Sequence, residues 1–340
     1  MAYILKKSEL KEKLISWSED SQVWLPLKRE NLSRFEHFTP TAELALESPH
    51  NTRVPPKELF LPQSEVLLKY RPGGAAEAAK LLQETRIVFG IHPCDTKAIT
   101  LLDTIFDTQE NNDSYWKARR ENTILIGLGC AEPCPTCFCT TVESGPFGSS
   151  GMDAIATDLG DSYHLRTIGS RASKFLKDLP ASSPEQDALA KEIQQRALNS
   201  ISKAFEVADL KIKMDNNFES AYWQQVSISC LGCGVCTFLC PTCFCFDIVD
   251  EAQRSERVRN WDTCMFNVYS LETSGHNPRP TKRERTRQRV MHKFSYWLDH
   301  VGKIGCTGCG RCVRYCPVGL DIRAMLRAAN ELPLETNHAQ

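Results

Sequence analysis

The sequence predicts an α+β protein with three consecutive regions: an N-terminal α/β unit, a helical connector and a cysteine-rich C-terminal domain. Three observations lead to this prediction. Short apolar runs suited to buried strands occur in the first region, a stretch with few helix breakers fills much of the second, and repeated CxxC arrays mark the third. We place the regions at residues 1–150, 151–228 and 229–340, a division that suits a chain of 340 residues.

The first region is expected to contain a strand, a helix and a second strand. Residues 86–91 (RIVFGI) and 123–128 (TILIGL) are apolar runs typical of buried strands, and Asp95 is placed to cap a helix between them. This order predicts a parallel pair of strands. Residues 5–17 have the apolar spacing of a further helix, and residues 183–210 of the connector are expected to form one long helix.

The composition excludes several classes of protein. Basic and acidic residues nearly balance, 41 against 42, so nucleic acid is not an expected partner. The sequence has no run of eighteen apolar residues, and we therefore expect no membrane insertion. The N-terminus lacks the apolar core of a signal peptide, which together with the cysteine pattern predicts a cytoplasmic protein.

The sixteen cysteines fall mainly in tight arrays, which indicate metal sites in a reducing compartment. The motif C-x2-C-x2-C-x3-C-P occurs twice, beginning at Cys230 and at Cys306. This spacing is typical of two-cluster [4Fe–4S] proteins, in which the fourth cysteine of each array ligates the other cluster. The crossed ligation predicts two ligand sets: Cys230, Cys233, Cys236 and Cys316 for one cluster, and Cys306, Cys309, Cys312 and Cys240 for the other.

The third region is therefore predicted to be a ferredoxin-like dicluster domain with an insertion at residues 246–304. Gly234 and Gly310, which follow the second cysteine of each array, let the backbone curl closely around inorganic sulfide. The alternative is a zinc-bearing binding module. Zinc favours two CxxC pairs separated by a longer span, and the close spacing of these cysteines would crowd one side of a tetrahedral ion.

Five further cysteines precede residue 140. Cys94 and Cys130 each follow a predicted strand, so both thiols are expected at the carboxyl edge of one parallel sheet, where ligands commonly bind. Cys137 and Cys139 would close a third [4Fe–4S] site from the following loop. Buried or free thiols are the alternative for this group.

Cys243, Cys245 and Cys264 have no assigned role. They could form a further metal site with a ligand such as His276, serve as structural thiols beside the clusters, or line a contact surface. Residues 279–293 (RPTKRERTRQRVMHK) contain seven lysines and arginines against one acidic residue. Because this stretch lies between the two arrays, we interpret it as compensation for cluster charge and as a contact for a partner.

Together these motifs resemble the iron–sulfur family that includes the beta subunit of sulfhydrogenase and the corresponding iron–sulfur subunit of anaerobic sulfite reductase. The resemblance runs nearly end to end. Besides the two arrays, it rests on His-Pro-Cys-Asp at 92–95, Cys-Phe-Cys at 137–139, Trp-Asp-Thr-Cys at 261–264 and Gly-His-Asn at 275–277. It implies that Cys94, Cys130, Cys137 and Cys139 ligate the third cluster, and Cys134 is not among the implied ligands.

The resemblance implies an electron-transfer subunit with no catalytic residues of its own. Such a subunit would relay single electrons through [4Fe–4S] clusters. One partner would be a subunit that binds FAD and a [2Fe–2S] cluster and reacts with NAD(P)H. The other would be a catalytic subunit of the hydrogenase, sirohaem sulfite reductase or heterodisulfide reductase type, and the sequence leaves the choice among these open.

Overall fold

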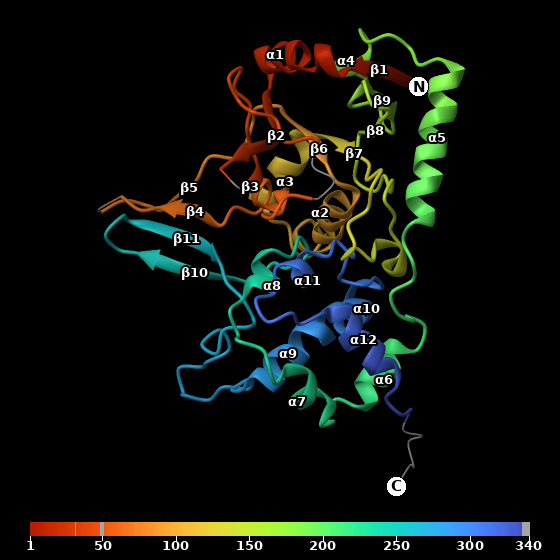
Figure 1. Ribbon diagram of the computed structural model, residues 1–340. Helices are drawn as coiled ribbons and strands as arrows, with labels where there is room; N and C mark the ends of the chain where they lie inside the picture. The colour runs from red at the N-terminus through yellow and green to blue at the C-terminus, as the bar shows by residue number, and fades with distance from the viewer. Residues whose placement is uncertain (31, 48–50, 72, 335–340) are drawn as a thin grey trace.

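The computed structural model describes residues 1–30, 32–47, 51–71 and 73–334. The chain is a mixed α+β protein, as predicted, with two β-sheets and many short helices. Figure 1 shows a sheet-containing upper part formed mainly by the first half of the chain, above a helical lower part formed by its C-terminal third. In the described residues no helix is long and apolar enough to cross a membrane.

The larger sheet has seven strands in the order β1-β9-β8-β7-β6-β2-β3. The central strands β8, β7, β6 and β2 are parallel, and the outer strands pair antiparallel. The strands expected at residues 86–91 and 123–128 are β6 and β7, and their parallel pairing is confirmed. The bounds are β1 Ala2–Lys6, β2 Gln22–Arg29, β3 Leu32–His37, β6 Arg86–Ile91, β7 Thr123–Leu128, β8 Ala154–Asp158 and β9 Ser162–Thr167.

Helices cover both faces of this sheet. α1 (Leu10–Asp20) packs with one side of β6 and β7 in one apolar cluster. α2 (Pro93–Phe106) and α3 (Ser114–Glu121) pack with the other side in a second cluster. Because both faces are covered, every residue of β6 and β7 is buried, which explains why the two strands read as continuous apolar runs.

Two local predictions in this unit are wrong. The helix expected over residues 5–17 begins only at Leu10, because the preceding residues form the edge strand β1 against β9. Asp95 does not cap α2: the N-cap is His92, and the Asp95 carboxylate accepts hydrogen bonds from Arg311. In both places contacts between distant segments override the local pattern.

The α/β unit extends past the boundary predicted near residue 150, because β8 and β9 belong to its sheet. The long helix expected over residues 183–210 is also shorter in the structure. α5 (Pro184–Asn199) begins with a capping box and ends before a non-helical stretch that leads to α6 (Leu210–Asn216). Phe205 lies in that stretch and packs against Phe138 and Phe294, which explains why the helix stops.

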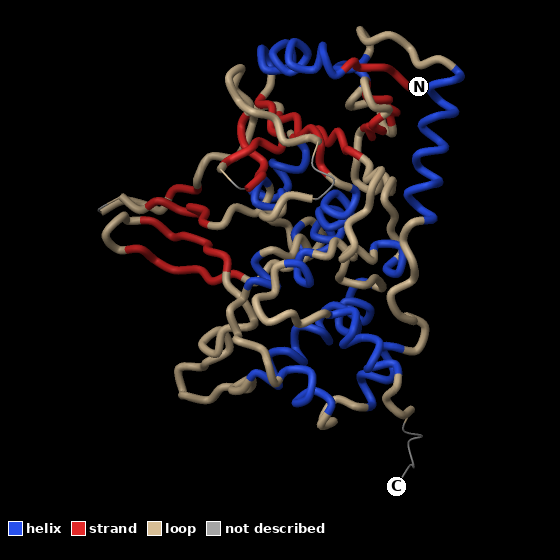
Figure 2. Tube along the Cα trace, viewed as in Figure 1, coloured by secondary structure: helices blue, strands red, loops and turns tan. Residues whose placement is uncertain are grey.

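A second sheet joins segments that are far apart in the sequence. Its order is β10-β11-β4-β5, and Figures 1 and 2 show it projecting from one side of the molecule. Arg259 of β11 is buried and forms ion pairs with Glu65 of β4 and with Asp113. The predicted insertion at 246–304 is thus anchored on the N-terminal region. The bounds are β4 Ser64–Lys69, β5 Glu77–Ala78, β10 Phe246–Glu251 and β11 Glu256–Trp261.

The lower part consists of short helices around the cysteine arrays. α9 (Lys282–Met291) continues through a π-helical turn, His292–Tyr296, into α10 (Trp297–Val301). This continuous helix packs with α12 (Ile322–Asn330) in one apolar cluster. The remaining helices are α4 Ser173–Leu176, α7 Tyr222–Ser227, α8 Val235–Phe238, α11 Arg311–Arg314 and the 3-10 turns Lys7–Glu9, Pro56–Leu59 and Cys139–Val142.

Candidate metal centres

The two cysteine arrays adopt the same backbone conformation. Gly232 and Gly308 have φ of 68° and 65°, and Gly234 and Gly310 have φ of 75° and 73°, in the left-handed region that favours glycine. The amides of Gly232 and Gly308 each donate a hydrogen bond of 3.4 Å to the first thiol of their own array. Amide donors to sulfur stabilise negative charge on a ligated cluster.

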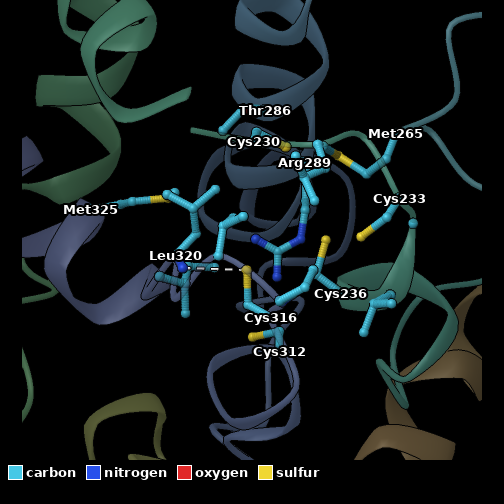
Figure 3. Close-up of a pocket in the computed structure, with 16 residues that line it drawn as sticks. Cys230, Cys233, Cys236, Met265, Thr286, Arg289, Cys312, Cys316, Leu320 and Met325 are labelled. Carbon is cyan, nitrogen blue, oxygen red and sulfur yellow. Dashed lines mark hydrogen bonds between the residues drawn. The ribbon is translucent and has the colours of Figure 1, made fainter. Parts of the chain in front are cut away.

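The first cavity is lined by thiols from both arrays, as Figure 3 shows. The predicted crossed set lies around it: Cys230, Cys233, Cys236 and Cys316. The amide of Leu320 donates to Cys316 Sγ at 3.3 Å. Because Cys233 is exposed, this cavity reaches the protein surface.

The second cavity lies deeper in the molecule. The other predicted set lines it: Cys240, Cys306, Cys309 and Cys312. The structure therefore brings the fourth cysteine of each array to the first three cysteines of the other array, as crossed ligation requires. Cys312 lines both the first and the second cavity, so the two are adjacent.

The third cavity is lined by all five cysteines of the first region: Cys94, Cys130, Cys134, Cys137 and Cys139. Cys94 lies in the first turn of α2 and Cys130 just after β7, at the expected edge of the sheet. Cys134 was not among the implied ligands, yet it lies in this group and accepts a hydrogen bond of 3.4 Å from Arg314. Cys309 lines both this third cavity and the second cavity, so these two cavities are adjacent.

Two buried cations face the first two cavities. Arg289 lines both cavities, and its Nε and Nη2 have no hydrogen-bond partner among the described residues. Lys293, in the π-helical turn, lines the second cavity and donates to Thr242 Oγ1 and the Gly305 carbonyl. A buried unpaired guanidinium needs an acceptor. A [4Fe–4S] cluster held by four thiolates supplies negative charge and sulfur acceptors, so the residues around these cavities fit that group.

Burial raises the pKa of thiols in all three cavities: to about 11 for Cys236, to about 12 for Cys306, and well above the usual value for Cys94. The nearby positive charges of Arg289 and Lys293 act in the opposite direction on Cys236 and Cys306 respectively. Because the thiolate is the metal ligand, these cysteines must lose protons when metal binds.

The second array packs closely against the N-terminal cysteine loop. The Phe138 amide donates to the Gly308 carbonyl at 2.9 Å. A Cβ atom on Gly308 would lie 2.5 Å from the Cys139 backbone nitrogen, and one on Gly310 would lie 2.5 Å from Thr136 Oγ1. These glycines therefore allow the second and third cavities to approach each other.

A buried ion pair holds the same two regions together. Arg311 of α11 and Asp95 of α2 are 0% and 1% exposed. The two guanidinium nitrogens of Arg311 donate to the two carboxylate oxygens of Asp95 at 2.6 and 2.8 Å, and Arg311 Nε donates to the Thr52 carbonyl at 2.7 Å. This bidentate pair connects the dicluster array directly to the helix that bears Cys94.

Replacing Gly308 with alanine is expected to destabilise the protein by about 1–3 kcal/mol more than the same change at Gly319. The two glycines have similar φ, 65° and 68°, but a Cβ on Gly319 would meet no atom within 4 Å. Comparing the two variants therefore separates the effect of the steric collision on stability from the effect of backbone strain. Denaturant midpoints of both variants, measured without oxygen, provide the test. Equal midpoints would contradict the inferred close packing.

The three unassigned cysteines lie close to the predicted ligands but do not line these three cavities. Cys243 contacts Cys240, and a hydrogen bond from Cys264 lowers the pKa of the Cys245 thiol to about 6. His276, suggested as a further ligand, lies in an exposed segment. A fourth metal site at Cys243, Cys245 and Cys264 stays a prediction.

The basic stretch at residues 279–293 points largely inward. Arg285, Arg287, Arg289 and Lys293 are all buried. Arg285 and Arg287 donate to backbone carbonyls, whereas Arg289 and Lys293 face the cysteine cavities. The inward orientation supports the interpretation as charge compensation.

Comparisons with known proteins agree with this geometry. Residues 229–320 match the family described as 4Fe-4S dicluster domain, and they include both arrays. The C-terminal part of the chain is therefore similar to a domain that carries two [4Fe–4S] clusters. The chain is 29% identical to sulfhydrogenase 2 subunit beta of Pyrococcus furiosus over 310 residues, which cover 89% of this chain and 90% of the relative. No solved structure matches it.

The domain match indicates two [4Fe–4S] clusters, and together with the similarity to the sulfhydrogenase subunit it supports an iron–sulfur electron-transfer subunit. The sequence did not reveal some residues that surround the cavities. Asn51 donates to the Cys309 carbonyl at 3.0 Å and approaches Cys94 Sγ at 3.7 Å, and His92 Nδ1 lies 3.2 Å from Cys130 Sγ. A single asparagine far from any array carries no sequence signal, whereas His92 adjoins the Pro-Cys-Asp motif.

Proposed function

We propose that the chain relays single electrons between an NAD(P)H-linked subunit, which binds FAD and a [2Fe–2S] cluster, and a catalytic subunit. The observation that carries this proposal is the row formed by the three cavities. Cys312 and Arg289 line the first and second cavities, and Cys309 lines the second and third. Neighbouring cavities that share a wall provide short steps for an electron.

We infer that Cys94, Cys130, Cys137 and Cys139 hold a third cluster. When bound, each [4Fe–4S] cluster accepts and gives up one electron at a time. The residues of the chain supply the thiolates, exclude water by burying most of them, and donate hydrogen bonds from backbone amides and from Arg314 to sulfur. No side chain in this arrangement needs to move a proton during transfer.

The two ends of the row reach different surfaces. At the first cavity Cys233 is exposed, and Leu231, which lines the same cavity, is 63% exposed; Ile228, five residues before Cys233 in the sequence, is 72% exposed. Exposed apolar side chains around a redox centre suit a docking surface for another subunit. At the other end, Cys130 and His92 line an open cleft of about 480 Å³. Each partner subunit would contact one of these ends.

We propose that the catalytic subunit is of the hydrogenase type. The name of the relative from Pyrococcus furiosus refers to a sulfhydrogenase, which favours a hydrogenase-type partner. A sirohaem sulfite reductase and a heterodisulfide reductase are the other candidates from the resemblance. The rival proposal, a zinc-bearing module, would need four ligands converging on one ion. Among the described residues no group of three or more His, Cys, Asp or Glu is placed to hold a single metal ion.

The experiment that tests this function begins with protein purified without oxygen, in which iron, acid-labile sulfide and zinc are counted. Three clusters correspond to about twelve irons and twelve sulfides per chain. Dithionite-reduced protein should then transfer electrons to the co-purified partner subunits. Zinc in place of iron, or iron-loaded protein that exchanges no electrons with the partners, would overturn the proposal.

The third ligand set is tested by serine variants at two neighbouring cysteines. Cys137→Ser is expected to lose the third cluster, about four irons per chain, because its thiol is an assigned ligand. Cys134→Ser is the matched control from the same loop and should retain all three clusters. Iron analysis and the electron paramagnetic resonance (EPR) spectrum of reduced protein distinguish the two variants. Loss of the cluster in Cys134→Ser with retention in Cys137→Ser would reassign the ligand.

A further inference from the structure

The side chain of Arg289 lies between the first and second cavities. Arg289 is 6% exposed, and its guanidinium extends into the first cavity between Cys236 and Cys316 (Figure 3). It also lines the second cavity. Two of its three nitrogens, Nε and Nη2, have no hydrogen-bond partner among the described residues. No carboxylate forms an ion pair with it in the described part of the chain, which is unusual for a buried arginine.

The neighbouring arginines of α9 show that the helix itself does not require an unpaired guanidinium. Arg287 donates to the Phe218 carbonyl, pairs with Glu219 and stacks on the Phe218 ring. Arg285 donates through Nη1 to the carbonyls of Arg279 and Pro280, and of its buried nitrogens only Nε has no partner among the described residues. Both have protein acceptors, whereas the cavities that Arg289 lines contain mainly cysteine thiols and apolar side chains. Burial lowers the pKa of Arg289, but four nearby cysteine sulfurs, among them Cys236 and Cys312 from the two predicted sets, together raise it above its usual value.

We propose that Arg289 is a positioning residue shared by the two dicluster sites, whose guanidinium donates hydrogen bonds to sulfur on both sides and raises the reduction potentials of both clusters together. A fixed positive charge favours the more negative, reduced form of each cluster. A planar guanidinium spreads five N–H donors over three nitrogens in a fixed fork and can therefore reach acceptors in two neighbouring cavities, whereas the three donors of an ammonium group lie on a single nitrogen. The inference rests on the proposed ligand sets for these two sites.

Lys293 provides the comparison within the same helix. It is buried and lines the second cavity, but it is not among the residues that line the first. Its ammonium already donates to Thr242 and to the Gly305 carbonyl. A charge that faces one cavity should change the reduction potential of one cluster, whereas a charge that faces both cavities should change the potentials of two.

The test is an anaerobic redox titration of the loaded protein, followed by EPR, for Arg289→Met, Lys293→Met and Arg287→Met. For Arg289→Met we expect the equilibrium constant for one-electron reduction to fall at least tenfold at both dicluster sites, a shift of about 59 mV each. Lys293→Met should shift one site, and Arg287→Met neither. Unchanged potentials in Arg289→Met, or a shift at only one site, would overturn the proposal.

Two further measurements distinguish a shifted reduction potential from the loss of a cluster. Iron and sulfide counts on each variant show whether both clusters are present, so that a lost cluster is not mistaken for a shifted potential. If Arg289→Met does not retain its clusters, Arg289→Lys is titrated instead. Its shorter ammonium reaches only one cavity, so one potential should stay near the wild-type value and the other should fall. Two unchanged potentials in that variant would contradict a shared role.

Discussion

Replacing Cys306 with alanine is expected to stop electron transfer between the two ends of the chain while the first and third clusters stay bound. Cys306 lines the second cavity and is not among the residues that line the other two. Because the second cavity lies between the others, its loss removes the middle step of the relay. The variant should contain about four fewer irons per chain than the wild type.

The measurement combines iron analysis with the rate at which reduced NAD(P)H-linked subunit passes electrons through the variant to the catalytic subunit. We expect this rate to fall to the level without the chain. Cys264→Ser is the matched control, since Cys264 is also buried but does not line these cavities, and it should transfer electrons normally. Normal transfer by an iron-depleted Cys306→Ala protein would show that electrons bypass the second site.

Arg311→Met is expected to lower the free energy of unfolding by about 3–5 kcal/mol, because it leaves the Asp95 carboxylate buried without its partner. Both side chains are almost fully inaccessible, and the pair forms two short hydrogen bonds between α2 and α11. The Thr52 carbonyl would lose its donor at the same time. Denaturant unfolding of the cluster-loaded protein, performed without oxygen, measures the change.

Two control variants show whether the loss of stability comes from the unpaired Asp95 carboxylate or from the removal of any arginine. The double variant Asp95→Leu with Arg311→Met removes both charges and should recover much of the stability lost in the single variant. Arg257→Met breaks the exposed Arg257–Asp250 pair on the β10–β11 hairpin and should hardly change the midpoint. A double variant as unstable as Arg311→Met alone would show that packing, rather than the unpaired carboxylate, causes the loss.

The metal-binding part of the fold could be predicted because its signals are local in sequence. Cysteines two residues apart and glycines at positive φ define the wrapping of the backbone, and both arrays adopt it. The apolar runs of β6 and β7 likewise predicted a parallel pair, because burial on both faces leaves no alternation. These features depend on neighbouring residues and need no knowledge of distant segments.

The features that were missed depend on contacts between distant segments. Leu189 and Leu198 lie at helical spacing in the connector but are 41% and 44% exposed, so apolar character alone did not reveal the buried face. Asp95 looked like a helix cap until Arg311, more than two hundred residues later, provided a stronger partner. The sequence indicated that the basic stretch compensates cluster charge, but it did not reveal that Arg289 in particular lines two cavities, because arginine is normally exposed.

The pairing of β4 with β11 has a consequence for how the protein is made. During translation β4 leaves the ribosome long before β11, and until then Glu65 has no Arg259 beside it. An unpaired strand edge invites association with other chains. We therefore expect that a gene fragment ending ahead of the β10–β11 hairpin yields an aggregating product, and that the cysteine-rich segment expressed alone exposes the complementary edge. Each half of the chain therefore covers a strand edge of the other half.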